Sequence, residues 1–170
     1  MAQFVLGEYY EFGGRSVPQD YAQAATWYRK AADQGLGDAQ YNLAQLYYDG
    51  KGVSQDYTQA EAWYRKAADQ GLAKAQFALG GLYLSGRAVA QDYAQAAAWY
   101  RKAADQGDAG AQYNLGILYT RGQGLPQSFA ESYFWLNLAA AGSNGADQEV
   151  RARTRDTTAA KLTPDEQSKV

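Results

Sequence analysis

The sequence contains no cysteine and no histidine among its 170 residues. These absences exclude disulfides, zinc sites built from thiolate and imidazole ligands, and catalysis by a cysteine nucleophile or a histidine base. The 16 basic residues nearly balance the 18 acidic ones, so charge gives no reason to expect a nucleic-acid partner or an anionic membrane surface. No apolar run approaches the ~20 residues of a membrane-spanning helix, so we expect no direct membrane insertion.

What the chain has instead is an internal repeat. The string WYRKAADQG occurs unchanged at 27–35, 63–71 and 99–107. The pair Ala-Gln recurs at 2, 39, 75 and 111, with spacings of 37, 36 and 36 residues. The one extra residue of the first unit falls in the loop 13–17. This period predicts four stacked units, approximately 1–38, 39–74, 75–110 and 111–142, followed by a segment 143–170.

Each unit is predicted to contain two helices. In the last unit, Ala111, Leu115 and Leu118 lie on one helical stripe, and glycines follow at 122 and 124. The second helix begins with a predicted capping box in every unit: Asp20/Gln23, Asp56/Gln59, Asp92/Gln95 and Ser128/Glu131. Two short helices cannot bury an apolar face alone, whereas stacked neighbours can. The predicted fold is therefore an all-α, right-handed αα-superhelix (a solenoid) of four helix-turn-helix repeats.

One position of the first helix is always small, and it is occupied by Gly7, Ala44, Gly80 and Gly116. Glycine costs about 1 kcal/mol relative to alanine inside a helix, which predicts that a backbone or a large ring lies close to this position. The constant tryptophans are the candidates for that ring, and we expect them to pack between neighbouring units: Trp27, Trp63, Trp99 and Trp135. Arg29, Lys30 and Asp33 and their equivalents are expected on the solvated outer face, with Arg–Asp pairs four residues apart.

The unit that begins AQYNLGILYTRGQGL at Ala111 resembles a Sel-1-like repeat, whose pattern is AxYxLGxLYxxGxGVxxDxxxAxxWYxxAAxxG. The second and third units match this pattern nearly throughout, and the likeness covers about residues 2–142. The period and the glycine loop favour this type over the 34-residue tetratricopeptide repeat. The resemblance implies an adaptor, as in bacterial envelope, secretion and host-contact processes or eukaryotic protein quality control. It leaves the compartment open, with the bacterial periplasm or secretion slightly favoured.

The fourth unit departs from the others, because Leu136-Asn137-Leu138 replaces Tyr-Arg-Lys. A helical wheel places Phe134 and Leu138 on the side that is charged in the other units. We expect a C-terminal capping helix within 146–162, with Val150 and Leu162 on its apolar face, to cover them; an exposed partner patch is the alternative. Residues 163–166 resemble the start of a further, truncated helix, which suggests that the chain is part of a longer array.

Four copies in one chain separate framework positions, which are constant, from positions that are free to differ. On the first helix the variable positions and one constant aromatic share an arc, which in helical solenoids usually lines the concave, binding surface. This arc is the predicted binding groove, acidic in the first units and basic at Arg121, although the alternative is a solvated surface that drifts without constraint. Its members are Phe4, Glu8, Glu11, Phe12, Tyr41, Asn42, Gln45, Tyr48, Asp49, Phe77, Leu84, Tyr113, Asn114, Ile117 and Arg121.

The predicted function is a non-catalytic scaffold that binds a peptide or protein segment in this groove, without a metal or cofactor. Glu8 and Glu11 form a carboxylate pair, but no other catalytic group accompanies them, and no Gly-rich phosphate loop is present. One alternative is a module that binds glycans or peptidoglycan fragments on the aromatic groove. A second alternative is a self-assembling subunit, with a homo-oligomer formed through Tyr133, Phe134 and Leu138.

Overall fold

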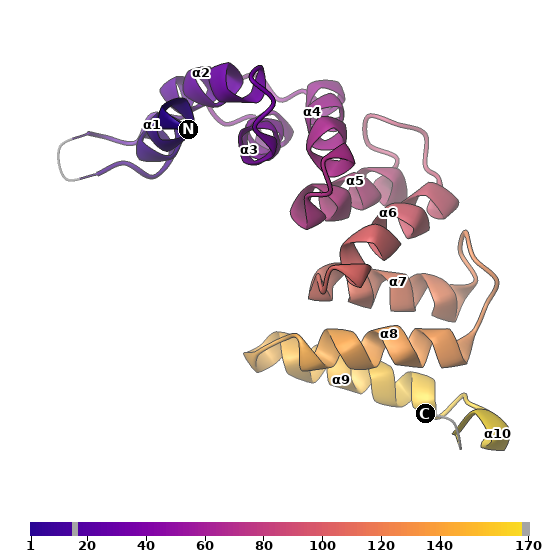
Figure 1. The fold of residues 1–170 in the computed structure, drawn as a ribbon. Coiled ribbons are helices and arrows are strands. Elements are labelled where there is room, and N and C mark those ends of the chain that lie inside the picture. Colours follow the sequence, from indigo (N-terminus) through magenta and orange to yellow (C-terminus); the bar gives the residue numbers. More distant parts are fainter. Residues whose placement is uncertain (15–16, 168–170) are drawn as a thin grey trace. The chain divides into compact units, whose positions relative to one another are not determined.

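The computed structural model describes residues 1–14 and 17–167, so part of the first glycine loop and the last three residues lie outside the described chain. The described residues form ten helices and no β-strand (Figure 1), which confirms the predicted all-α repeat fold. None of these helices is long and apolar enough to cross a bilayer. The helices are α1 (Ala2–Phe12), α2 (Tyr21–Ala32), α3 (Gly37–Asp49), α4 (Tyr57–Asp69), α5 (Ala73–Ser85), α6 (Tyr93–Asp105), α7 (Ala109–Arg121), α8 (Phe129–Ala141), α9 (Gly145–Ala159) and α10 (Pro164–Gln167).

The helices belong to two compact units. Unit one comprises 1–79 and 87–89, and unit two comprises 80–86 and 90–170, so that α5 contributes to both. Within unit one, α1 packs on α2, α2 on α3 and α3 on α4. Within unit two, the same consecutive packing joins α6, α7, α8 and α9. The helices α2, α3, α7 and α8 thus each pack on the helix before and on the helix after, as an αα-repeat requires.

The predicted N-caps are present, but only half of each capping box forms. The Asp56 carboxylate accepts hydrogen bonds from the backbone N–H groups of Thr58 and Gln59 at 2.9 and 3.0 Å, and Asp20, Asp92 and Ser128 cap their helices in the same way. The N–H of Asp56 donates to the carbonyl of Tyr47 at 3.0 Å, instead of receiving the side chain of Gln59. A bond from the last turn of the first helix therefore takes the place of the reciprocal half of the box.

A glutamine next to each N-cap adds a second bond between the paired helices. Gln55 Nε2 donates to the carbonyl of Tyr48 at 2.9 Å, which satisfies an acceptor that α3 itself leaves unpaired. The same bond recurs from Gln19, Gln91 and Gln127 at 2.7–2.8 Å. These four bonds hold the end of each first helix against the start of the second, and they fix the angle at which the chain turns.

The small position of the first helix lies against a tyrosine, not a tryptophan. A β-carbon built on Gly80 would lie 2.7 Å from Cδ1 of Tyr100, and one built on Gly7 would collide with the ring of Tyr28. At Gly116 the neighbour is Cγ of Leu136, at 2.8 Å. The close approach that the sequence predicted is present, but the prediction of tryptophan was wrong, because the ring belongs to the next residue along the second helix.

Two of the tryptophans, Trp63 and Trp135, contact the preceding repeat as expected, and the arginines differ from expectation. Trp63 is buried, with the guanidinium of Arg29 5.6 Å from its ring centre on one side and Lys66 3.9 Å away. Arg29 also donates to the hydroxyl of Tyr47. Arg29 therefore reaches from its own helix to the next repeat. The sequence had predicted instead that it pairs with Asp33 on the outer face of its own helix.

In unit two the same arrangement recurs. Arg101 donates to the hydroxyl of Tyr119 and lies 5.5 Å from the ring centre of Trp135. Cation–π contacts of this kind are worth about 1 kcal/mol when partly desolvated. A residue that resembled solvated charge in the sequence is thus part of the contact between successive repeats.

The third glycine loop contains one non-glycine residue with left-handed backbone. Ala88 has φ +64°, whereas Gly52 and Gly124 at the equivalent positions have φ +67° and +70°. Alanine is less stable than glycine in this region by about 1 kcal/mol or more. A β-carbon on Gly52 or Gly124 would also collide with the backbone at the start of the preceding repeat's second helix, so glycine has two reasons to be there.

At the C-terminus, α9 packs on α8, but it does not cover the residues that it was expected to cover. Phe134 is 51% exposed, Leu138 37% and Val150 56%. Leu162 and Thr158 are the buried residues of this segment. The helix approaches α8 from another side: Arg155 donates to the side-chain oxygen of Asn137 at 3.2 Å, and Arg151 lies over the ring of Tyr113. The expectation that 146–162 shields Phe134 and Leu138 was therefore wrong.

Candidate binding surface on the first helices

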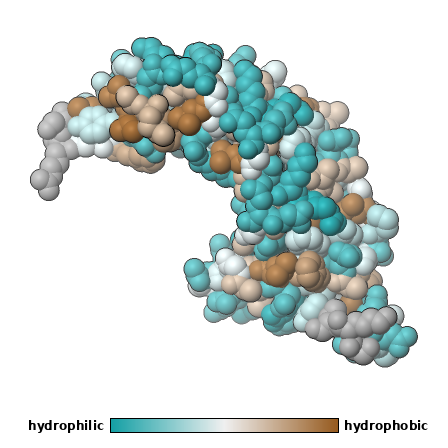
Figure 2. All heavy atoms as spheres, viewed as in Figure 1, coloured by the Kyte–Doolittle hydropathy of each residue, from teal (hydrophilic) through white to brown (hydrophobic). Residues whose placement is uncertain are grey.

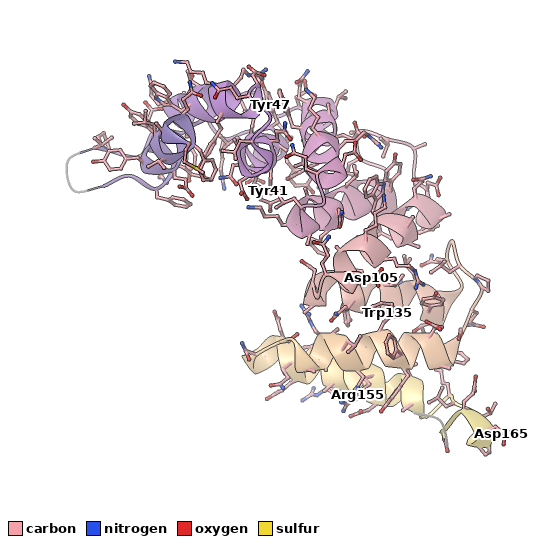
Figure 3. All side chains as sticks on the ribbon, viewed as in Figure 1. Tyr41, Tyr47, Asp105, Trp135, Arg155 and Asp165 are labelled. Carbon is pink, nitrogen blue, oxygen red and sulfur yellow. The ribbon has the colours of Figure 1, made fainter. Side chains whose placement is uncertain are left out.

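All fifteen residues of the predicted arc lie on the first helices of their repeats, and none of them is buried. Phe12, Asp49 and Arg121 are exposed, and the others are half-buried. Figure 3 shows how one helix divides: Tyr41, on the arc, and Tyr47, on the framework side, project from different sides of α3. The arc residues up to Phe77 belong to unit one, and those from Leu84 onwards belong to unit two.

Several arc residues serve the buried tyrosines of the second helices. The hydroxyl of Tyr28, whose side chain is fully buried, donates to Oε2 of Glu11. Burial raises the pKa of Tyr28, the bond to Glu11 raises it further, and a hydrogen bond from Asn42 acts in the opposite direction. Glu11 and Asn42 therefore hold this hydroxyl from two sides, and Tyr28 is neutral at any physiological pH.

The other repeats satisfy the same hydroxyl with different residues. Tyr64 donates to Oε1 of Gln45 at 2.8 Å, and burial is the main cause that raises its pKa. Burial raises the pKa of Tyr100 to about 12, and a hydrogen bond from Asn114 lowers it. The variable positions are thus not free of structural roles: several of them provide the polar partner that a constant, buried hydroxyl needs.

The aromatic residues of the arc brace the same tyrosines. Phe4 packs on Tyr28 with ring centres 5.7 Å apart, and Tyr41 packs on Tyr64 at 5.6 Å, both in tilted geometry. Lys74 lies 4.6 Å from the ring centre of Tyr41. These rings are consequently fixed in position before any ligand arrives, with part of each ring still accessible to solvent.

Tyr48 forms a second aromatic platform in unit one. Its ring meets Tyr57 edge-to-face at 5.2 Å, and its hydroxyl accepts a hydrogen bond from Nη1 of Arg87 at 2.6 Å. Arg87 is exposed and also lies 5.5 Å from the ring centre of Tyr57. Sequence reasoning missed Arg87, because it belongs to the loop of the next repeat and no periodicity relates it to the arc.

The arc of unit two is built around Tyr113 of α7. Arg151 of α9 lies 5.7 Å from the ring centre of Tyr113, a contact that the sequence gave no reason to expect. Leu84 of α5 and Ile117 of α7 are apolar and half-buried, and Arg121 is exposed at the end of α7. This part of the arc offers aromatic and aliphatic surface with positive charge.

Charge differs between the two parts. In unit one the arc includes the carboxylates of Glu8, Glu11 and Asp49, and Asp49 pairs with Lys51 at 3.1 Å. The side chain of Gln45 donates to Asp49 at 3.2 Å. Among the described residues, no group of three or more acidic, histidine or cysteine side chains lies together as a metal site would need. The arc of unit one thus offers hydrogen bonds, rings and carboxylates.

The geometry defines a helical repeat protein whose polar, preorganised side chains lie on the first helices. The Sel1 repeat model matches residues 1–36, 37–72, 73–108 and 109–144, so this chain belongs to the Sel1 repeat family. Proteins of this family are generally non-catalytic scaffolds for protein interactions. A search of curated proteins gave no significant match.

Several solved structures are similar to this chain, and three of them are described here. A protective antigen of uropathogenic Escherichia coli with an SLR fold is 44% identical over 82% of this chain, with a TM-score of 0.80. A Sel1 repeat protein from Oxalobacter formigenes is 36% identical over 89%, with a TM-score of 0.81. The chain spans 30% of the first protein and 62% of the second. Cysteine-rich protein B of Helicobacter pylori, 22% identical over 81% of this chain and 99% of its own length, shares the fold with a TM-score of 0.60.

Proposed function

We propose that this chain is a non-catalytic scaffold that binds an extended segment of another protein on the arc of its first helices. The observation that carries the proposal is the contrast within each helix. The constant positions Ala39, Leu43 and Leu46 are buried, whereas no member of the arc is. The arc is therefore the surface on which the repeats differ from one another and which remains open to a partner.

Preorganisation supports this surface as a binding site. Phe4, Tyr41 and Gln45 are each held by a defined contact with a buried tyrosine, so they lose little rotamer freedom when a partner binds. An extended segment presents backbone donors and acceptors along its length. Amide side chains such as Gln45 and Asn114 carry both kinds of group and suit such a ligand.

The charges specify the partner further. Unit one offers Glu8, Glu11 and Asp49, and unit two offers Arg121. Unit one would match lysine or arginine side chains of a partner, and unit two a carboxylate. Glu11 already accepts the hydrogen bond from Tyr28. In this proposal the carboxylate pair Glu8 and Glu11 therefore serves recognition of the partner and not catalysis.

A displayed library of random peptides, selected on the immobilised chain, tests the proposal. We expect the selected peptides to carry basic residues and to lose about tenfold in affinity with Glu8→Arg, since reversal of a charge in contact with a ligand costs on the order of 1–2 kcal/mol. The matched control is Asp69→Arg. It changes the net charge equally at an exposed position at the end of α4.

Equal affinity for Glu8→Arg and Asp69→Arg would contradict the groove, provided that both variants keep their melting temperature. Enrichment of no peptide, together with retention of muropeptides on the same immobilised chain, would favour the alternative of a glycan-binding module on the same rings.

Self-association through α8 is a second candidate, because Phe134 and Leu138 remain exposed on one face of that helix. Tyr133, next to them, is half-buried. Static light scattering over a hundredfold range of concentration tests it. A mass that rises with concentration, and that returns to the monomer value with Phe134→Ser, would support a homo-oligomer; a constant monomer mass would contradict it.

A further inference from the structure

A groove with an apolar floor is lined by α2, α3 and the loop that follows α3, all within unit one. Its cavity of about 460 Å³ has the size of a small-molecule site. The floor includes Ala25 and Leu43, which are buried, and Val53, which is half-buried. The surface over α2 is polar, as the hydrophilic side chains along the upper edge of Figure 2 show. None of the residues that line the groove belongs to the arc.

The loop after α3 closes one end of the groove. Gly52 has φ +67°, and a β-carbon built on it would lie 2.2 Å from the backbone carbonyl carbon of Tyr21. The loop backbone therefore lies directly against the start of α2, where Ala22 and Val53 line the cavity. A space that is closed in this way suits a short apolar group better than a chain that passes through it.

Arg29 provides a positive charge in this groove. It is half-buried, and its fixed partners are the hydroxyl of Tyr47, to which it donates, and the ring of Trp63, 5.6 Å from the guanidinium. Asp33 also lines the cavity, but among the described residues no ion pair joins Arg29 to a carboxylate. The groove thus holds a half-buried cation whose partners are neutral.

The second repeat shows what an arginine at this position accepts. Glu61 occupies the position of Ala25, and Arg65 occupies that of Arg29. Nε of Arg65 donates to Oε1 of Glu61 at 2.8 Å, and Nη2 donates to the same oxygen. The side chain of Glu61 is only 16% exposed. A carboxylate is therefore held beside this arginine, largely out of water.

The third repeat agrees with the first. Ala97 occupies the position of Ala25, and Arg101 donates to the hydroxyl of Tyr119. Within the described part of the chain, Arg101 likewise forms no ion pair. The arginine thus has a carboxylate partner where glutamate lies four residues before it, and none in the two repeats with alanine there. A ligand that brings a carboxylate to this place would supply charge-assisted hydrogen bonds, which are stronger than those between neutral groups.

We propose that the groove of unit one binds a small aliphatic carboxylate. The ligand's carboxylate accepts hydrogen bonds from Arg29, in the place that the carboxylate of Glu61 takes in the second repeat. Its apolar body, of several carbons, lies over Ala25, Leu43 and Val53. Because the groove shares no residue with the arc, this site and the proposed protein-binding surface can each fail without the other.

The test is a titration of the isotope-labelled full chain with hexanoate, followed by nuclear magnetic resonance. We expect saturable shifts in the amides of Ala25 and Val53 and in the Nε–H of Arg29, at about millimolar concentration for so small a ligand. 1-Hexanol has the same apolar body without the charge, and it should bind at least tenfold more weakly. Hexylammonium, with the opposite charge, should cause no shifts at these residues.

Variants of the chain complete the test. Ala25→Glu should abolish binding, because it places an internal carboxylate beside Arg29 as the second repeat does. Its matched control, Gln23→Glu, adds the same charge at an exposed position of α2 and should leave the affinity unchanged. Arg29→Gln should weaken hexanoate about tenfold or more, whereas Arg65→Gln should have no effect. The melting temperature of each variant verifies that it is folded, and Arg29→Gln decides if Ala25→Glu does not fold.

Several outcomes overturn the proposal. They are the absence of shifts with hexanoate, equal affinity for hexanoate and 1-hexanol, and hexanoate binding that folded Ala25→Glu or Arg29→Gln leaves unchanged. A blocked peptide with a single glutamate, titrated in the same way, distinguishes the source of the carboxylate. Shifts at Ala25 and Val53 with this peptide, but none with hexanoate, would overturn a small-molecule ligand, because the groove would then accept an acidic side chain of a protein.

Discussion

The helix pair α3–α4 in unit one and the pair α7–α8 in unit two solve the same packing problem with different chemistry. In the first pair the buried residue is Tyr64, and Gln45 accepts a hydrogen bond from its hydroxyl. In the second, Leu136 takes the place of the tyrosine, and a buried hydroxyl is supplied by Ser132, which donates to the carbonyl of Gly116 at 2.8 Å. Thr120 lies within hydrogen-bond distance of Ser132.

The difference shows that polar and apolar positions change together. Ser132 replaces the Ala60 of the other pair, so the hydroxyl moves by one turn of the helix when the tyrosine is lost. A buried polar atom without a partner costs about 1–3 kcal/mol, which explains why the hydroxyls of Tyr28 and Tyr64 each have an acceptor on a first helix. Glu11 and Gln45, which belong to the arc, are thus constrained by the fold.

The largest loss of stability is expected where the ring of Tyr100 lies against Gly80, the small position of α5. Gly80→Leu should destabilise the chain by about 3 kcal/mol, because the added side chain must displace the buried ring of Tyr100. Ala44, at the equivalent position of the second repeat, is buried and already carries one β-carbon, so Gly80→Ala should cost far less. Thermal unfolding followed by circular dichroism measures both. Equal melting temperatures for Gly80→Leu and the parent chain would show that the close approach is not real.

The second prediction removes the hydroxyl from the first pair. Tyr64→Phe should lower the free energy of unfolding by about 1–2 kcal/mol, because it leaves the half-buried Gln45 without its donor. Urea unfolding measures the loss. The double variant Tyr64→Phe with Gln45→Leu should recover much of it, and a double variant less stable than Tyr64→Phe alone would refute the view that the two residues act as a pair.

The same loss in the second pair should be smaller. Ser132→Ala removes the bond to the carbonyl of Gly116, but alanine is the residue that the other repeats carry there. We expect a cost of about 1 kcal/mol in urea unfolding. A cost well above that of Tyr64→Phe would mean that the two pairs are not equivalent solutions.

The last effect is absent at neutral pH and appears only in alkali. The ordinary tyrosine pKa is 10.0, and burial raises that of Tyr100 to about 12 in the folded chain. The unfolded chain therefore releases this proton first, and the free energy of unfolding is unaffected below pH 10 and falls as the pH rises from 10 to 12. Tyr100→Phe should reduce the slope of stability against pH in this window. Leu136→Ala, in the repeat without the tyrosine, should lower stability without changing the slope, and an identical slope for Tyr100→Phe would contradict the assignment.

Periodicity alone predicted the repeats, the helix pairs and the N-caps, because those features depend on residues close together in the sequence. It did not distinguish which of two adjacent rings, Trp99 or Tyr100, faces Gly80, since the two positions differ only by a rotation of the helix. It also did not predict that Glu11 and Asn114 are hydrogen-bond partners of buried tyrosine hydroxyls, because this depends on how far each tyrosine side chain reaches across the helix pair. Whether a neighbouring helix covers a side chain such as Phe134 depends on how whole helices pack, so the sequence of one repeat does not predict it.

Photo-crosslinking tests the central claim most directly. A peptide selected on the chain, with benzophenone groups introduced along its length, would be irradiated in the complex, and the linked residues would be located by mass spectrometry. The account predicts links to arc residues of the first helices in both units, such as Tyr48 and Ile117. Links concentrated on the outer faces of the second helices, at Lys66 and Lys102 for example, would contradict it.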